Sequence, residues 1–293
     1  MRKARKYAAL MIAGAVVMAS CGSDKKTEST SAATTATTAA GGGVDCKPIK
    51  AGVLSVVTSL PGPNFWGTSN GESDPDQIKS GIEYDLANDI AAKCGLKMEF
   101  KNVNFDTIVS GAVAADSYDI ALSQVTITED RAKKVDFSVP YFKADQGLLV
   151  KAGTKVASWD DVKKLTLGVQ STTTAEYYYA SGEVAATKLP NVKVFPDLAT
   201  AYQALTGGQV DGVIIDTPIN LGQASQSGGK LEVVAQFKTG EEYGAIFGKG
   251  NGKKEILDPI IQGLNDDGTV TALIAKYLGG DPTTVPFIDV PAS

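Results

Sequence analysis

Two successive series of short apolar runs and amphipathic segments fill the chain from residue 45 onward. Apolar runs that alternate with helix-like segments are typical of α/β lobes with largely parallel sheets. The strand-like runs are IKAGVLSVV, LKMEFKNV and DIALSQV in the first series, and LTLGVQ, VKVF, VDGVIID and LEVVAQF in the second. The helix-like segments are DLANDIAAKCG, FDTIVSGAVAA and TEDRAKKV, then TTAEYYYASG, LATAYQALTGG and TPINLGQASQ. The sequence therefore predicts an α/β protein with two lobes, each with its own core.

Two segments, one from each series, share one design. GAVAADSYDIALS and ALTGGQVDGVIID each contain a helical stretch, a small polar turn and a strand that an Asp opens. Similar lobes that face one another form a cleft at the carboxyl ends of their strands, where ligands of open α/β sheets bind. A single larger sheet would also suit the pattern. We expect the functional residues at these strand ends.

The first twenty residues have the pattern of an export signal. Four basic residues precede the run AALMIAGAVVMAS, which is too short to span a bilayer permanently, and Cys21 follows it. The tripeptide Ala19-Ser20-Cys21 resembles a bacterial lipoprotein box, in which Cys21 becomes the lipidated first residue. The sequence thus predicts a lipoprotein signal peptide over residues 1–20, and an ordinary signal peptide cut elsewhere is the alternative.

The residues after Cys21 are small and polar, without periodicity. The stretch SDKKTESTSAATTATTAAGGGV has too few apolar side chains to form a core. We predict a tether over residues 21–44. No later stretch has the pattern of a transmembrane helix.

Composition excludes several classes of function. The chain has no histidine, which rules out a Ser-His-Asp triad, a Cys-His pair and a zinc site with a histidine ligand. Without the signal, the formal net charge falls from -5 to -9, because residues 1–20 hold four basic residues and no acid. An acidic chain argues against a nucleic acid partner. Hydrolytic chemistry is not expected, and neither a metal nor a cofactor is predicted.

The strand DIALSQV brings polar residues and then an arginine to the predicted cleft. Ser123, Gln124 and Thr126 come at or just after its end, and Thr128 is a suitable N-cap for the helix that holds Arg131. A guanidinium one turn from unpaired helical N–H groups suits a carboxylate. The alternative is an ordinary surface charge, because two lysines follow.

The second series offers complementary groups. QSTTTAEYY contains a capping box, Thr173 with Glu176, and places Thr174 near another helix start. Asp216 ends the strand VDGVIID directly before Thr217-Pro218, so it is either an N-cap or a counter-ion for an ammonium group. An arginine on one lobe and a carboxylate on the other would hold a zwitterion, which is the form of an α-amino acid.

Several of these segments, in this order and spacing, resemble the bacterial extracellular solute-binding proteins of family 3, the amino-acid receptors of ABC importers. The segments are DLANDIAAKCG, FDTIVSG, YDIALSQVTITEDRAKKVDFSVPYF, GVQSTTTAEYY, VIIDTP and EEYGAIFGKGN. The resemblance implies a two-lobed type II periplasmic-binding fold, with hinge strands near DQGLLVKAG and YGAIFGK. It also implies a first lobe of residues 45–145 plus 243–293 and a second lobe of residues 146–242.

The resemblance assigns roles by position. Arg131 corresponds to the residue that binds the ligand α-carboxylate, with help from Thr126 and Thr174. Asp216 corresponds to the acceptor of the α-ammonium, and Phe105 to the aromatic that packs on the ligand. The positions of Ser123, Gln124 and Gln170 line the same cleft.

The function implied is that of an exported, monomeric binding protein. It would be lipid-anchored to the cell envelope and would deliver an amino acid to a membrane permease without breaking a bond. The alternative is a dehydratase on the same fold, similar to the cyclohexadienyl or arogenate enzymes, with Glu176 as the nominee for the general acid.

The chain departs from the family where the ligand side chain would lie. Gln124 stands where many relatives carry glycine, and Phe65-Trp66 arrive late in a longer loop. We expect the side chain to face Gln124, Gln170, Phe105 and this loop. None of these residues is charged, so we predict a polar, uncharged amino acid as ligand. If the acidic residues Glu72, Asp74 and Asp76 line the pocket instead, a basic ligand is expected.

Two cysteines remain besides Cys21. Cys46 precedes the first strand and Cys94 ends the helix that returns to the next strand, so both are expected at one edge of the sheet. In an exported protein this proximity favours a disulfide. The alternative is two separate core residues.

Overall fold

A computed structural model describes residues 44–67 and 74–290. These described residues belong to one compact unit. Four features that the sequence predicts lie outside the described residues: the signal peptide, Cys21, the tether before residue 44 and Glu72.

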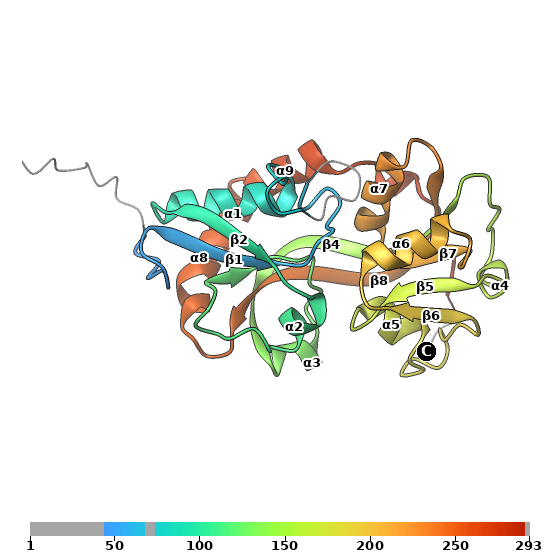
Figure 1. The fold of residues 1–293 in the computed structure, drawn as a ribbon, viewed down its shortest axis with the longest axis horizontal. Coiled ribbons are helices and arrows are strands. Elements are labelled where there is room, and N and C mark those ends of the chain that lie inside the picture. The colour runs from blue at the N-terminus through green and yellow to red at the C-terminus, as the bar shows by residue number, and fades with distance from the viewer. Residues whose placement is uncertain (1–43, 68–73, 291–293) are drawn as a thin grey trace, which may run out of the picture. The chain divides into compact units, whose positions relative to one another are not determined.

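One eight-stranded sheet runs through this unit in the order β2-β1-β3-β8-β4-β7-β5-β6 (Figure 1). Strands β2, β1 and β3 are parallel to one another, as are β7, β5 and β6, while β8 and β4 run antiparallel in the middle. The strands are β1 (Val53–Thr58), β2 (Lys97–Asn102), β3 (Ile120–Ala121), β4 (Val135–Lys151), β5 (Leu167–Gln170), β6 (Val192–Phe195), β7 (Gly212–Asp216) and β8 (Leu231–Gly248).

Helices cover both faces of each parallel half (Figure 1). We call the half with β1–β3 the first lobe and the half with β5–β7 the second lobe. The first-lobe helices are α1 (Ile82–Lys93), α2 (Phe105–Val109), α3 (Glu129–Ala132), α8 (Lys253–Asp266) and α9 (Thr269–Tyr277). The second-lobe helices are α4 (Trp159–Val162), α5 (Thr174–Tyr179), α6 (Leu198–Thr206) and α7 (Thr217–Gln226), and a short 3-10 helix, η1 (Pro282–Thr284), follows near the chain end.

The two similar segments of the sequence occupy equivalent places. Strand β3 lies between the parallel strand β1 and the antiparallel strand β8. Strand β7 lies in the same way between β5 and β4. Each lobe therefore ends, on its inner side, in a strand that follows a helical segment and a polar turn.

The long strands β4 and β8 connect the lobes, and the expected boundaries at residues 145/146 and 242/243 fall within them. Their pairing is irregular near the middle: Ala144 pairs with Glu241, but Gln146 already pairs with Phe237. The extra residues of β8 include Gly240 at φ 65°, a left-handed conformation that glycine adopts without a Cβ penalty. The run LEVVAQF was predicted as a separate strand, whereas here it continues across this irregularity to Gly248.

Two elements of the first lobe are shorter than predicted. The helix predicted over residues 105–115 ends after Val109, and Gly111 at φ 72° turns the chain away from the helical path. The strand predicted over residues 119–125 pairs only at Ile120 and Ala121. It ends early because Gln124 has a φ of 49°, which an extended strand does not accommodate.

A disulfide joins Cys46 to Cys94, the C-cap residue of α1. It links the segment before β1 to the end of the helix that packs on this strand. Within the described residues, no helix is long and apolar enough to cross a membrane.

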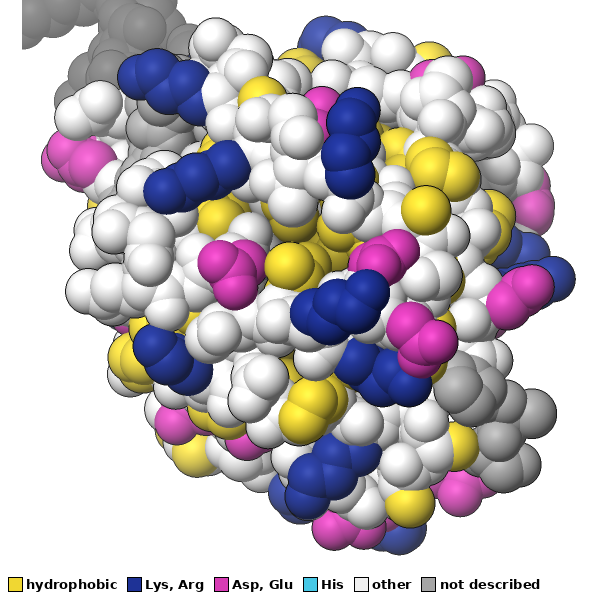
Figure 2. Space-filling view, turned by 90° about the vertical axis from the view of Figure 1, so that its right-hand side faces the viewer, with side chains coloured by type: hydrophobic (Ala, Val, Ile, Leu, Met, Phe, Trp, Pro, Cys, Tyr) yellow, Lys and Arg dark blue, Asp and Glu magenta, His cyan; other side chains and the backbone are white. Residues whose placement is uncertain are grey.

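The end face of the second lobe carries basic and acidic side chains interspersed among neutral ones (Figure 2). Around α4, Lys163 and Lys164 pair with Asp160 and Asp161 at 2.5 and 2.9 Å. Exposed pairs of this kind contribute little to stability. On this face, the mixture of signs leaves no extended positive surface of the kind that nucleic acid requires.

Candidate functional site

One cavity between the lobes is lined by all eight residues that the sequence nominated for the ligand. Five come from the first lobe and three from the second. They are Phe105, Ser123, Gln124, Thr126 and Arg131, then Gln170, Thr174 and Asp216.

Strand ends and helix starts deliver these side chains. Gln170 is the last residue of β5 and Asp216 the last residue of β7, so two neighbouring parallel strands of the second lobe end at the cavity. In the first lobe, the side chain of Thr128 caps α3 and accepts a hydrogen bond from the backbone N–H of Arg131 at 3.2 Å. The predicted cap is therefore present, and it places Arg131 at the start of its helix.

Arg131 contacts both lobes. Its Nη1 donates to the carbonyl oxygen of Thr126 at 2.8 Å, and its Nη2 donates to that of Thr172, in the second lobe, at 2.9 Å. The guanidinium carbon lies 5.6 Å from the centre of the Phe105 ring. Burial lowers the pKa of Arg131 from its ordinary value, and the carboxylates of Asp216 and Glu241 oppose this shift. An arginine in such a place stays protonated and offers a fixed positive charge.

Asp216 faces the cavity instead of capping its helix. It occupies the N-cap position of α7, but its side chain makes no capping hydrogen bond. Its two oxygens accept hydrogen bonds from Nε2 of Gln146 and from the hydroxyl of Tyr243. Burial, followed by the nearby charge of Glu241, raises the pKa of Asp216 to about 8. The carboxyl group is thus held where a cation would favour its ionised form.

Glu241, a residue of β8 that the sequence analysis did not nominate, lies behind the cavity. Oε2 of this buried carboxylate accepts hydrogen bonds from Thr126 at 2.6 Å and from Thr174 at 2.7 Å. Its Oε1 accepts from Gln146 at 2.8 Å. The two threonine hydroxyls expected to help bind a ligand carboxylate therefore donate to a carboxylate of the protein itself.

The signal for Glu241 is weak in the sequence. It stands beside Glu242 in a strand, and a pair of acidic residues there suggests a solvated edge. Only Glu242 fits that description, since it is half exposed and lies 3.7 Å from Lys143.

Phe65 and Trp66, which belong to the loop expected at the side-chain end of the site, do not line the cavity themselves. Both are buried in the core, where Phe65 lies 5.2 Å from Phe142 and Trp66 lies 4.8 Å from Phe100, measured between ring centres. Large rings bury more apolar area in the core than in a small polar cavity. The preceding residues of the loop line the cavity instead: Ser59, Leu60 and Pro61.

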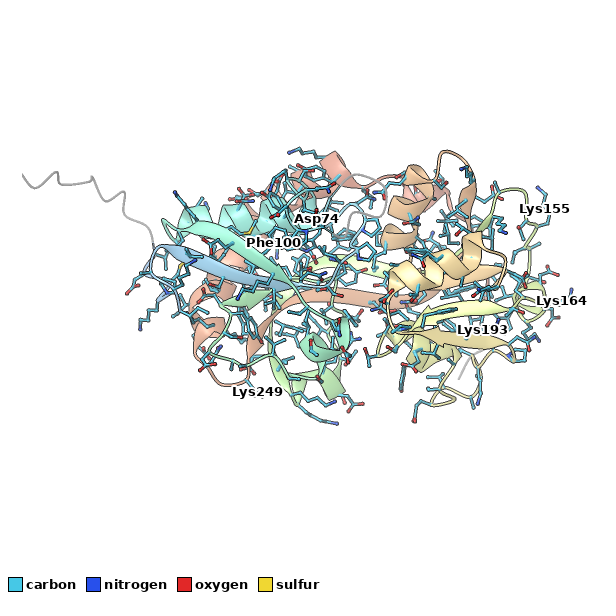
Figure 3. All side chains as sticks on the ribbon, in the orientation of Figure 1. Asp74, Phe100, Lys155, Lys164, Lys193 and Lys249 are labelled. Carbon is cyan, nitrogen blue, oxygen red and sulfur yellow. A yellow bond between two sulfur atoms is a disulfide. The ribbon has the colours of Figure 1, made fainter. Side chains whose placement is uncertain are left out.

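Asp74 and Asp76 are exposed and do not line this cavity. The Asp74 carboxylate accepts from the backbone of Asp76 at 3.1 Å and from Gln77 at 3.0 Å, so it stabilises a local turn. In Figure 3, Asp74 lies on the side of the sheet that α1 covers. These two residues thus give no support to the basic-ligand alternative.

Asp197 is an acidic residue that lines the cavity and that the sequence did not reveal. It is half-buried and caps α6, where its carboxylate accepts a hydrogen bond from the backbone N–H of Thr200 at 2.7 Å.

Glu83 is a second carboxylate that the sequence did not reveal. This residue of α1 is fully buried and accepts four hydrogen bonds, from Trp66, Tyr141 and both the backbone and the side chain of Gln124. Burial raises the pKa of Glu83 to about 7 although these hydrogen bonds favour the ionised form. It supports the wall of the cavity from behind.

Comparison with known proteins identifies the family. Residues 70–280 match the family of bacterial extracellular solute-binding proteins, family 3. The chain belongs to this family. It is similar to a probable histidine-binding protein of Neisseria gonorrhoeae, with 30% identity over 227 residues, which cover 74% of this chain and 84% of the relative.

Solved structures agree. An ancestral arginine-binding protein bound to glutamine superposes with a TM-score of 0.66 at 34% identity, covering 79% of this chain and 100% of that one. The ancestral amino acid-binding protein AncCDT-1, a precursor of cyclohexadienyl dehydratase, gives a TM-score of 0.63 at 30% identity, covering 78% and 95%. The predicted type II periplasmic-binding fold and the solute-binding role within an ABC importer are confirmed.

Proposed function

We propose that this family member binds an α-amino acid between its lobes, with Arg131 holding the α-carboxylate and Asp216 the α-ammonium. The observation that carries the proposal is that opposite charges from different lobes line one cavity. A ligand with both charges contacts both lobes, and such contacts stabilise the closed arrangement. Phe105 beside Arg131 offers an apolar surface to the ligand.

The ligand side chain is proposed to be polar and uncharged. Besides Arg131, the described residues that line the cavity include no lysine or arginine, so an acidic side chain finds no second cation among them. Asp197 is half-buried and already accepts hydrogen bonds from Thr200, so it does not require a cation. The amides of Gln124 and Gln170 suit a neutral polar group. Relatives named for histidine, glutamine and arginine indicate that the family alone does not fix the ligand.

The proposed partner is the permease of an ABC importer, which receives the amino acid when the lobes open. Export and lipid anchoring through Cys21 are part of the proposal, supported by the pattern of residues 1–21. The binding protein would act as a monomer.

A dehydratase activity is not favoured. Glu176, its nominated general acid, does not line the cavity, and its carboxylate accepts from the backbone N–H of Thr172 at 2.6 Å. This bond differs slightly from the predicted capping box, in which the carboxylate would reach Thr173.

A thermal-shift screen with the twenty amino acids tests the proposal. A ligand present at a hundred times its Kd adds about 2.7 kcal/mol to the free energy of unfolding. We expect a shift with one or a few polar amino acids, and the loss of that shift in Arg131→Ala. The control is Lys133→Ala, since Lys133 is exposed and pairs only locally with Asp130. If no amino acid stabilises the wild-type protein, the proposal is wrong.

A further inference from the structure

We propose that Glu83 and Gln124 form an acceptor subsite, in which Glu83 fixes the amide of Gln124 so that its oxygen faces the ligand side chain and selects a carboxamide over a carboxylate. The inference rests on the proposed amino-acid function and names the class of side chain accepted. It makes Glu83 a positioning residue, because Glu83 acts through Gln124.

The orientation of the Gln124 amide follows from its partner. Nε2 of Gln124 donates to Oε2 of Glu83. An ionised carboxylate only accepts hydrogen bonds, so the nitrogen of the amide must face it and the oxygen must face elsewhere. The other donors to Glu83 are Trp66 Nε1 at 2.7 Å and the hydroxyl of Tyr141, and both hold the carboxylate in place.

The oxygen of this amide is the end that Glu83 leaves free to accept a hydrogen bond. In the described part of the chain, no group donates a hydrogen bond to Oε1 of Gln124, and this atom is not among the fully buried oxygens that lack a partner. A Cβ built on Gly62 would lie 3.1 Å from it, so the oxygen lies against the loop that holds Pro61. Gln124 and Pro61 both line the cavity.

The backbone of Gln124 is held in an unusual conformation as well. Its φ of 49° is in the left-handed region, which is unfavourable for a residue other than glycine. Its N–H donates to Oε1 of Glu83 at 2.7 Å. Glu83 therefore fixes both ends of this residue, and such over-determined strain is typical of functional positions.

The surroundings favour a donor from the ligand. Asp197 also lines the cavity and offers no donor, because its carboxylate only accepts hydrogen bonds. The Gln170 amide can donate to or accept from either ligand, so it does not discriminate between them. A ligand carboxamide can donate its N–H groups to Gln124, whereas an isosteric carboxylate would bring a negative charge against the oxygens of Gln124 and Asp197. An unmet buried acceptor costs about 1 to 3 kcal/mol. The expected preference for glutamine over glutamate is therefore roughly 5- to 150-fold in Kd.

Titration calorimetry with glutamine and glutamate at about pH 8.5, where the Glu83 carboxyl is ionised, tests this. The informative variant is Glu83→Gln. The new amide has one oxygen in place of two, so it cannot accept from Trp66 and from both N–H groups of Gln124, and it no longer holds the nitrogen of the Gln124 amide towards residue 83. The ratio of the two Kd values should then fall to within about threefold. A purely structural role would weaken both ligands together and leave the ratio unchanged.

Gln124→Met serves if Glu83→Gln does not fold, because it removes the acceptor and should also abolish the preference. Lys133→Ala is the control: Lys133 is exposed, pairs with Asp130 on its own helix and should keep both Kd values and their ratio. Equal binding of both ligands by the wild type, or an unchanged ratio in Glu83→Gln, overturns the inference while the amino-acid function stands. Failure to bind either ligand, or any other amino acid, would instead count against the proposed function.

Discussion

The hydroxyl groups of Thr126 and Thr174, from different lobes, donate to the same oxygen atom, Oε2 of Glu241. Together with the bond from Arg131 to the carbonyl of Thr172, this arrangement links the two lobes through polar contacts beside the cavity. The contacts exist only while the lobes lie close together, so they contribute to the free energy of closure.

Replacement of either threonine by valine should weaken ligand binding. Each change removes one hydrogen bond that joins the lobes, worth about 0.5 to 1.5 kcal/mol, or roughly 2- to 12-fold in Kd. Because the two hydroxyls share one acceptor, the double variant should not show the sum of the two effects. Calorimetric Kd values for the two single variants and the double variant check this, and strict additivity would contradict it.

Arg131→Ala should abolish useful binding while the protein remains folded. Loss of one partner of a desolvated charge pair costs about 2 to 5 kcal/mol, or about 30-fold to several thousand-fold in Kd. Circular dichroism establishes that the variant is folded, and calorimetry measures the loss. A change of less than about threefold would remove Arg131 from the site.

Ligand binding at about pH 6.5 should release a proton from Asp216. The pKa of this carboxyl is raised to about 8, so it is protonated at that pH and must ionise to accept the α-ammonium. The Kd should fall by up to about tenfold per pH unit as the pH rises towards 8. Calorimetry in two buffers of different ionisation enthalpy counts the protons released, and Asp216→Asn should bind weakly with no such release. An absence of proton release in the wild type would argue against the assignment.

The stability of the protein should depend on pH through Glu83. Its pKa is about 7 in the folded chain, above the unfolded value of about 4.3, so between these values the folded state binds the extra proton. This contribution to stability is present at low pH and is lost as the pH rises, by up to about 1.4 kcal/mol per unit. Urea unfolding of the wild type and Glu83→Gln at about pH 5 and 7 measures it. The free energy of unfolding of the wild type minus that of the variant should decrease as the pH rises. An increase of this difference with pH would refute the prediction.

Competition among glutamine, asparagine, glutamate, arginine and lysine tests the charge of the ligand. We expect the carboxamides to bind most tightly, because Arg131 is the only cation among the described residues that line the cavity and Asp197 already caps α6 through Thr200. Tightest binding of arginine or lysine would mean that Asp197 acts as the partner of a basic side chain. Asp197→Asn would then lose the basic ligand selectively.

The fold and the residues that line the cavity could be predicted from the sequence, because both depend on patterns among neighbouring residues. Strand ends, the Thr128 cap and the Asp216-Thr217-Pro218 step are read from neighbouring residues, and the structure brings the nominated side chains together. The roles of these residues in binding stay predictions.

Patterns among neighbouring residues do not predict contacts between residues that are far apart in the chain. Glu83 approaches Gln124 across 41 positions and Glu241 approaches Thr126 across 115. A buried carboxylate in an amphipathic helix or a strand looks like a solvated charge until its donors are known. The burial of Phe65 and Trp66 was missed for the same reason, since their partners Phe142 and Phe100 lie far away in the chain.

The irregular pairing of β4 and β8 has a thermodynamic consequence. Gln146 and Glu241 lie at this irregularity, and Nε2 of Gln146 bonds both Glu241 and Asp216. We expect that bending of the two strands at this irregularity moves Glu241 relative to Gln146, and thereby alters how tightly Asp216 holds its proton. Proton binding to Asp216 and opening of the lobes are then coupled. Protonation changes the free energy of opening by the same amount by which opening changes the free energy of proton binding.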